Sequence, residues 1–146
     1  MSGICGAFGC RGGDDVSAVL QPMSAVGVDM LRSGASAVGV YGAPRAAVVV
    51  EHKGVLVAIV GHPRLGSDGG TSVTPAAIAE AVAADGVSAL ASMRGDFAIA
   101  AWDPAKLRGF VAIDRVGVRQ LVYANVGQTL AFASTADRLA RIPAVD

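Results

Sequence analysis

The sequence is poor in the residue types that most often build metal, redox and nucleic-acid sites. It has two cysteines, Cys5 and Cys10, and two histidines in 146 residues. No histidine or further cysteine lies at ligand spacing from these cysteines, which argues against a zinc site. Charged residues make up only 16% of the chain and balance at 12 of each sign. With no basic cluster, we expect neither nucleic acid nor an anionic membrane as a partner.

Long hydrophobic runs are also missing, although 53% of the residues are hydrophobic. No run reaches the ~18 apolar residues that a transmembrane helix needs. We expect no secretory leader, which together with the few thiols predicts a cytoplasmic protein. Aromatic residues are scarce at 5%, and the hydrophobic excess is mostly alanine and valine. This composition predicts buried sheets and helices of small residues within one domain over 1–146.

Apolar runs of strand type dominate the pattern. A glycine-rich first strand is expected over 1–10. An antiparallel meander of three strands is expected over 37–42, 46–51 and 54–61. A pair of strands joined by a proline turn is expected over 94–103 and 108–114. A hairpin is expected over 121–125 and 129–134. We expect 61–74 to be a loop. Strand-rich blocks separated by whole helices predict two packed sheets with helices outside.

Helices are expected in three places. Pro22 fits a first helical turn, and the residues after it form one apolar helical stripe: Met23, Val26, Gly27, Met30 and Leu31. Thr74 and Pro75 are a hydroxyl cap and a first-turn proline, so a second helix is expected from there to about Asp85. Gly86 interrupts it before a short piece that reaches Met93, and a last helical turn covers 135–141.

The first nine residues, from Met1 to Gly9, join small residues with Ile4 and Phe8. Glycine suits a central strand that lies close to neighbouring backbone. One reason to bury a chain terminus in this way is catalysis by the first residue, whose own α-amine serves as the base. Ser2 would be that nucleophile after removal of Met1. The alternative is a plain glycine-rich first strand.

Four ordered blocks carry a resemblance to a known family. They are Met1-Ser-Gly-Ile-Cys-Gly6, Arg94-Gly-Asp-Phe-Ala-Ile-Ala-Ala-Trp-Asp103, Phe110-Val-Ala-Ile-Asp-Arg-Val-Gly-Val-Arg-Gln-Leu-Val-Tyr123 and Leu130-Ala-Phe-Ala-Ser134. In order and spacing they resemble the amino-terminal glutaminase domain of the asparagine synthetase family, a class II glutamine amidotransferase. The resemblance implies an α+β fold, the four-layer αββα sandwich of N-terminal-nucleophile hydrolases with two mainly antiparallel sheets.

Domains of this family release ammonia from glutamine and pass it to a second domain that activates a carboxylate with ATP. The pyrophosphate loop of that second domain, S-G-G-x-D-S, is absent from this sequence. We therefore expect the chain to be one part of a larger enzyme, partnered by an ATP-binding synthetase domain or subunit. ATP and magnesium are expected in that partner, and no cofactor or metal is expected in this chain.

The positions that match the family's pocket are mostly changed. Ser2 replaces the nucleophilic cysteine, and an alcohol is far less ionised than a thiol. Val60 replaces an asparagine that donates to the oxyanion, whereas Gly61 is kept as a remaining donor. Arg45 is a weak match for the arginine that holds the α-carboxylate of glutamine. Thr74 falls at the position of the aspartate that binds its α-amine.

Several other residues bear on the same site. Ser67-Asp68 could be a displaced match for that aspartate. Cys5 is expected to leave the opposite face of the first strand from Ser2 and to be a small buried hydrophobe. His62 follows Gly61 at the mouth of the family's pocket, and a ligand or catalytic role for it is the less favoured alternative. Asp114 is expected to brace the turn at Gly117.

Several changes in one pocket predict a degenerate glutaminase domain with a structural and interface role. They resemble the branch of the family that contains β-lactam synthetases and lasso-peptide cyclases, where the substrate supplies its own amine. Macrolactam formation on a peptide is the reaction favoured within this branch, with a peptide substrate or a leader-peptide-binding subunit as a further partner. The alternative is an active glutamine amidotransferase domain with Ser2 as its nucleophile. Trp102 and Tyr123 are expected in the core or at a domain interface.

Overall fold

The computed structural model describes residues 1–9, 16–24, 27–43, 45–65, 71–143 and 145. Two antiparallel sheets form its centre. The first has the strand order β10-β11-β1-β3-β2 and the second β4-β5-β8-β9. The strands of the first sheet are β1 (Gly3–Phe8), β2 (Val28–Ser33), β3 (Ser36–Tyr41), β10 (Val122–Val126) and β11 (Thr129–Ala133). Those of the second are β4 (Ala47–His52), β5 (Val55–Gly61), β8 (Phe97–Asp103) and β9 (Arg108–Ile113).

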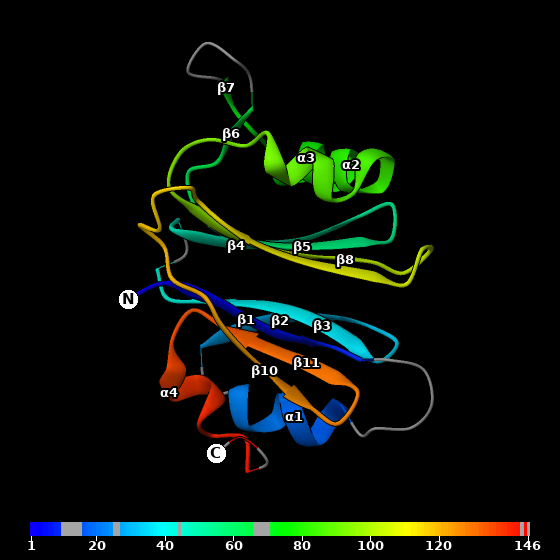
Figure 1. Cartoon of the computed structure of the whole chain (residues 1–146), viewed down its shortest axis with the longest axis vertical. Coiled ribbons are helices and arrows are strands. Elements are labelled where there is room, and N and C mark those ends of the chain that lie inside the picture. The colour runs from blue at the N-terminus through cyan, green and yellow to red at the C-terminus, as the bar shows by residue number, and fades with distance from the viewer. Residues whose placement is uncertain (10–15, 25–26, 44, 66–70, 144, 146) are drawn as a thin grey trace.

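Helices cover the outer faces of the two sheets (Figure 1). The first sheet is covered by α1 (Val16–Met23) and α4 (Ala136–Leu139), and the second by α2 (Pro75–Asp85) and α3 (Val87–Ala91). Three hydrophobic clusters fill the spaces between helices and first sheet, between the sheets, and between second sheet and helices. The expected αββα sandwich is confirmed.

Strand β1 lies in the middle of the first sheet, between β3 and β11. Glycine permits this packing, because a Cβ on Gly6 would collide with the carbonyl oxygen of Ala37 and with the Phe132 ring. Side chains alternate along the strand. Ile4 and Phe8 enter the space between the sheets, whereas Cys5 packs on the helix side.

Three aromatic rings occupy the space between the sheets. The ring of Phe8 lies 5.6 Å from that of Trp102 on β8 and 4.9 Å from that of Phe132 on β11, measured between centroids. All three side chains are buried, so Trp102 is confirmed as a core residue. The cluster joins the central strand of the first sheet to the second sheet.

The predicted helix at Thr74 is confirmed. The Thr74 hydroxyl accepts a hydrogen bond of 3.2 Å from the backbone N–H of Ala77, and Pro75 is the first helical residue. Gly86 ends the helix at a φ of 58°, with its N–H donating to the carbonyl of Val82. A glycine with a positive φ stops α2 here and lets α3 start in a new direction.

The predicted helix after Pro22 is wrong. Helix α1 ends at Met23, so Pro22 lies in its last turn, and the stripe continues into strand β2. Gly27 has a φ of 88°, which no helix continues through. In β2, Met30 packs toward the helices and Leu31 toward the other sheet. A strand with an apolar side chain on each face can show the i, i+3, i+4 spacing of a helix. The backbone pairing of this segment with β3 makes it a strand.

The predicted meander is also wrong in its first step. Strand β3 pairs with β1 and β2 in the first sheet, whereas β4 and β5 pair in the second. The chain therefore crosses between sheets after Tyr41. The loop expected over 61–74 contains a short hairpin of β6 (Arg64–Leu65) and β7 (Thr71–Ser72). The hairpin of β10 and β11 and the pair β8 and β9 are as predicted.

Part of the sequence-based description lies outside the described residues, including Cys10 and Ser67-Asp68. Of the helices that are described, none has the length and apolar character required to span a membrane.

Replacing Phe8 with alanine should remove the central ring of the aromatic cluster and leave a cavity between the sheets. Loss of a buried Phe costs about 3–5 kcal/mol of unfolding free energy, which urea unfolding followed by circular dichroism would measure. Val116→Ala is the control, because Val116 is 87% exposed and its loss should cost under ~0.5 kcal/mol. Equal losses for both variants would contradict the assignment of the core.

Candidate functional site

Ser2 lies immediately before β1, at the rim of a hollow between the two sheets. The hollow has a volume of about 350 Å³. Its walls come from the chain terminus, the end of β5, the link from β9 to β10, and the residues that follow β11. The lining residues are Met1, Ser2, Val60, Val118, Arg119, Gln120, Ser134 and Thr135. Four segments far apart in the sequence thus meet at the expected nucleophile position.

Backbone contacts fix the start of β1. The Ser2 hydroxyl oxygen accepts a hydrogen bond of 2.9 Å from the N–H of Ala43. The N–H of Ile4 donates to the Ser134 hydroxyl at 2.9 Å, and the Ser134 N–H donates to the carbonyl of Ile4 at 2.8 Å. Gly42 lies so close that a Cβ there would collide with Ser2. The serine is therefore held by neighbouring backbone rather than by a base among the side chains that line the hollow.

Val60 and Gly61 end strand β5 beside the hollow. Val60 is 1% exposed and belongs to the cluster between the sheets. The N–H of Gly61 donates to the carbonyl of Ala46 at 3.2 Å, so this donor is used within the sheet. The φ of Gly61 is 95°, and a Cβ there would collide with the carbonyl of Asp96. Close packing explains why this position is glycine.

Arg45 and Thr74 lie away from the hollow. Arg45 is exposed in the turn before β4, and the Thr74 hydroxyl caps helix α2. Neither lines the cavity that holds Ser2. The structure thus brings Ser2 and Val60 together, places Gly61 next to them, and leaves the other two candidates outside.

Arg119 is a polar wall residue that we did not predict from the sequence. Its Nη2 atom donates to Asp96 Oδ2 at 3.0 Å, while its buried Nε has no hydrogen-bond partner among the described residues. The only sequence signal was its place, five residues after Asp114 in the family-like block. Ser134 stood in another such block without an assigned role.

Asp114 holds the wall that carries Arg119. Its carboxylate accepts hydrogen bonds from the N–H groups of Val118 at 2.9 Å and of Arg119 at 3.0 Å. Its carbonyl accepts from the N–H of Gly117 at 3.1 Å. The predicted bracing role of Asp114 at this turn is confirmed.

Charges near the hollow are already paired. Burial would raise the pKa of Asp96, but the hydrogen bond and charge of Arg119 hold that pKa below its ordinary value. His62 lies at the outer side of this pair, with Nδ1 3.5 Å from Asp96 Oδ1, and its side chain is 73% exposed. His62 is not among the residues that line the hollow. The cation in the wall is therefore neutralised by the protein itself.

Cys5 is not placed to act as a nucleophile. Its side chain is buried on the helix side of β1. Burial raises the pKa of its thiol to about 11, against a weaker opposing effect from the charge of Arg138. A thiol of this kind stays protonated near neutral pH and is unreactive. The predicted role as a buried small hydrophobe fits this environment.

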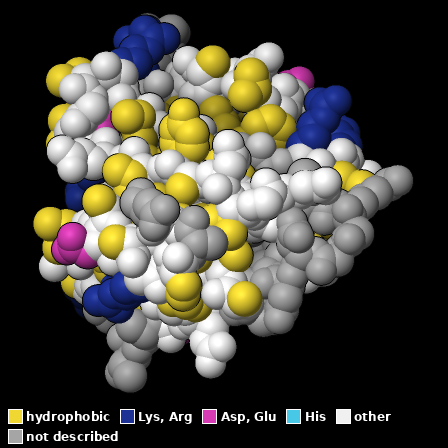
Figure 2. Space-filling model, turned by 60° about the horizontal axis from the view of Figure 1, so that its bottom comes forward, with side chains coloured by type: hydrophobic (Ala, Val, Ile, Leu, Met, Phe, Trp, Pro, Cys, Tyr) yellow, Lys and Arg dark blue, Asp and Glu magenta, His cyan; other side chains and the backbone are white. Residues whose placement is uncertain are grey.

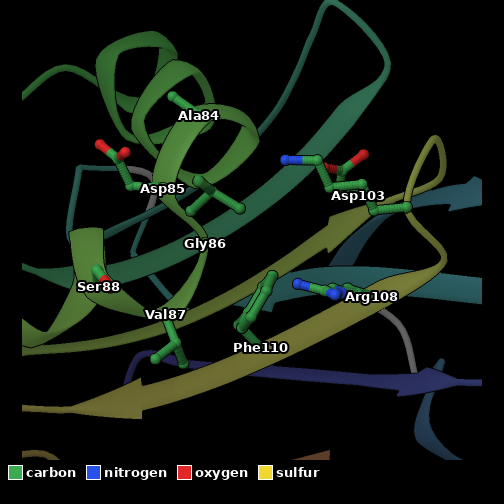
Figure 3. Close-up of a pocket in the computed structure, with 10 residues that line it drawn as sticks. Ala84, Asp85, Gly86, Val87, Ser88, Asp103, Arg108 and Phe110 are labelled. Carbon is green, nitrogen blue, oxygen red and sulfur yellow. The ribbon is translucent and has the colours of Figure 1, made fainter.

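A second hollow of about 320 Å³ lies where α2 meets α3, above the hairpin of β8 and β9. Figure 3 shows Phe110 and Arg108 on β9, facing the junction of α2 and α3 at Gly86. Two of the hollow's charged residues, Asp103 and Lys106, have structural partners. Asp103 Oδ1 accepts a hydrogen bond from the N–H of Ala105 at 3.0 Å. Lys106 Nζ donates to the carbonyl of Ala83 at 2.5 Å.

No group of three or more His, Cys, Asp and Glu side chains that could hold a metal ion is found within the described part of the chain.

The turn at Asp114 should make stability depend on acid. Hydrogen bonds from the N–H groups of Arg119 and Val118 lower the pKa of Asp114 from its ordinary value of 3.8. The stabilisation is complete above about pH 4 and is lost as pH falls through the lowered folded-state pKa. Urea unfolding between pH 2 and pH 7 should therefore show a shallower acid loss of unfolding free energy for Asp114→Asn than for the wild type. Asp137→Asn, at an exposed position on α4, is the control, and an unchanged profile for Asp114→Asn would contradict this role.

The chain is similar to known proteins in sequence and in fold. A family model described as a glutamine amidotransferase domain matches residues 59–141. No curated protein matches the chain. A solved structure of glutamine phosphoribosylpyrophosphate amidotransferase from B. subtilis, complexed with ADP and GMP, is similar over 96% of this chain, with 14% identity and a TM-score of 0.60.

The chain covers 43% of that structure, so it spans less than half of its length. At this identity the likeness concerns the fold alone, and that fold is the N-terminal-nucleophile sandwich found here. The family match covers more than half of the chain. The chain therefore belongs to the glutamine amidotransferase domain family.

Proposed function

We propose that this domain is a degenerate glutaminase domain, which supports an ATP-dependent amide-forming synthetase domain or subunit instead of supplying it with ammonia. The main support for the proposal is that neither of the two expected oxyanion donors is free to donate. The side chain of Val60 has no donor, and the N–H of Gly61 is used by Ala46. Loss of one oxyanion donor costs on the order of 10²–10³ in rate.

The hollow also has few groups that would bind the ammonium group and carboxylate of glutamine. A free amino acid brings an ammonium group and a carboxylate, and each needs a partner when it leaves water. None of the described residues that line the hollow is acidic, so the ammonium group has no counter-charge there. The cation of the wall, Arg119, is paired with Asp96.

The mouth of the hollow supports an interface role. Val116 and Val118 are 87% and 64% exposed on the link from β9 to β10, and Val118 lines the hollow. Exposed apolar side chains beside a site favour contact with another domain. ATP and magnesium belong to the proposed partner, and its reaction would be amide or macrolactam formation on a substrate that brings its own amine. A peptide or a leader-peptide-binding subunit would then be a further partner.

An active glutaminase is the second candidate. One observation favours it, because Ser2 lies at the rim of a hollow that also contains an arginine. Serine can act as an N-terminal nucleophile when its own amine is free to serve as the base. Mass spectrometry of the amino terminus would show whether Met1 precedes Ser2 in the purified protein.

Incubation of the purified chain with glutamine should release no ammonia above the no-protein background, as measured by coupled glutamate dehydrogenase oxidation of NADPH. The variant Ser2→Cys should stay inactive, because a better nucleophile restores neither the oxyanion donor nor the grip on the substrate. The double variant Ser2→Cys with Val60→Asn tests the donor directly.

An active glutaminase domain, assayed in parallel, serves as the positive control. Ammonia release by the wild type that disappears in Ser2→Ala would contradict the proposal and establish the second candidate. Thermal unfolding of each variant confirms that it is folded before its activity is interpreted.

A further inference from the structure

Edge strands normally carry features that prevent pairing with another chain, such as charged residues or proline. The two sheets have four edge strands: β10 and β2 in the first, β4 and β9 in the second. Three of these contain charged residues, namely Asp29 and Arg32 in β2, Glu51 in β4 and Arg108 in β9. Strand β10 reads Val-Tyr-Ala-Asn-Val and contains neither a charge nor a proline. Among the edge strands of the two described sheets, β10 is the one that carries neither of these features.

The hydrogen-bond pattern shows which backbone groups of β10 are free. The N–H of Ser134 donates to the carbonyl of Ile4 on β1. Because bonding direction alternates along a strand, Phe132 also bonds toward β1, while Ala131 and Ala133 bond toward β10. Their partners in register are Ala124 and Val122.

Tyr123 and Asn125 therefore direct their N–H and carbonyl groups away from the sheet. Apart from the ladder with β11, the described part of the chain offers these two residues no hydrogen-bond partner. Their side chains are exposed, that of Tyr123 at 67%. Figure 1 shows β10 in front of β11 and β1. Figure 2 shows hydrophobic side chains across the middle of the visible face, with Lys and Arg toward its margins.

We propose that β10 pairs with β10 of a second copy of this chain, antiparallel about a two-fold axis at Ala124. The strand is symmetric in its pattern about this residue, since Val122 then faces Val126 and Tyr123 faces Asn125. The outward groups of Tyr123 and Asn125 meet each other in this register. Two such pairs form roughly four backbone hydrogen bonds.

Side-chain packing and net charge also favour a second copy of this chain as the partner of β10. The two Tyr123 rings become diagonal neighbours on one face, a separation that aromatic side chains bridge. The chain has a formal net charge of zero, so two copies approach without net repulsion. A single strand pair is a small interface, and such interfaces give weak association. The dimer should accordingly form at high protein concentration and dissociate on dilution.

Sedimentation equilibrium tests the proposal across protein concentrations up to the high micromolar range. The wild type should show a monomer–dimer equilibrium. Asn125→Lys and Tyr123→Lys should each raise the dissociation constant by roughly tenfold or more, because a lysine on an edge blocks pairing. Val48→Lys adds the same charge on the other sheet's edge strand β4, where Val48 is 40% exposed, and should leave the equilibrium unchanged.

Disulfide trapping tests the register. In a Cys10→Ser background, Ala124→Cys should cross-link on mild oxidation, because the two copies of residue 124 face each other at ~4.5 Å between Cα atoms. Val122→Cys should not, because its two copies lie about four residues apart along the strands, on the order of 13 Å.

A wild type that stays monomeric at every concentration would overturn the proposal, as would a dimer that survives both lysine variants. Equal cross-linking at positions 122 and 124 would overturn the register. Thermal unfolding shows whether each variant is folded, and none of these readouts depends on glutamine.

Discussion

The close packing of β1 inside the first sheet is the constraint on which the rest of the structure depends. Gly6 lets β3 and the Phe132 ring approach the strand, and Phe8 at its far end stacks against Trp102 of the second sheet. One short strand thereby joins both sheets. It also fixes Ser2 at the end of the sandwich where β5 and the link after β9 converge.

Under the proposal of a degenerate glutaminase domain, the same constraint preserves the frame of the site while its chemistry is lost. Several groups near Ser2 have structural tasks in this molecule. Gly61 bonds within its sheet, Asp114 holds a turn, and Arg119 is paired with Asp96. The hollow itself results from the meeting of sheet ends, so its presence does not depend on the groups that the proposal describes as lost.

The features that the sequence predicted correctly depend on interactions between residues close together in the chain. The cap at Thr74, the stop at Gly86 and the bracing role of Asp114 depend on neighbours within a few residues, and the structure has them as predicted. The segment after Pro22 could not be assigned in this way, because a strand apolar on both faces has no distinct period and its partner β3 decides its structure. The place of Arg119 in the wall likewise depends on Asp96, which lies far away in the sequence.

Covalent labelling at Ser2 tests the central claim most directly. The purified chain would be incubated with a diazoketone analogue of glutamine, which alkylates an N-terminal nucleophile that can bind and attack the side-chain carbonyl. Intact-mass and peptide mass spectrometry would then locate any adduct. The account predicts an unmodified chain under conditions that label an active glutaminase domain completely. A stoichiometric adduct on Ser2 that excess glutamine prevents would contradict it.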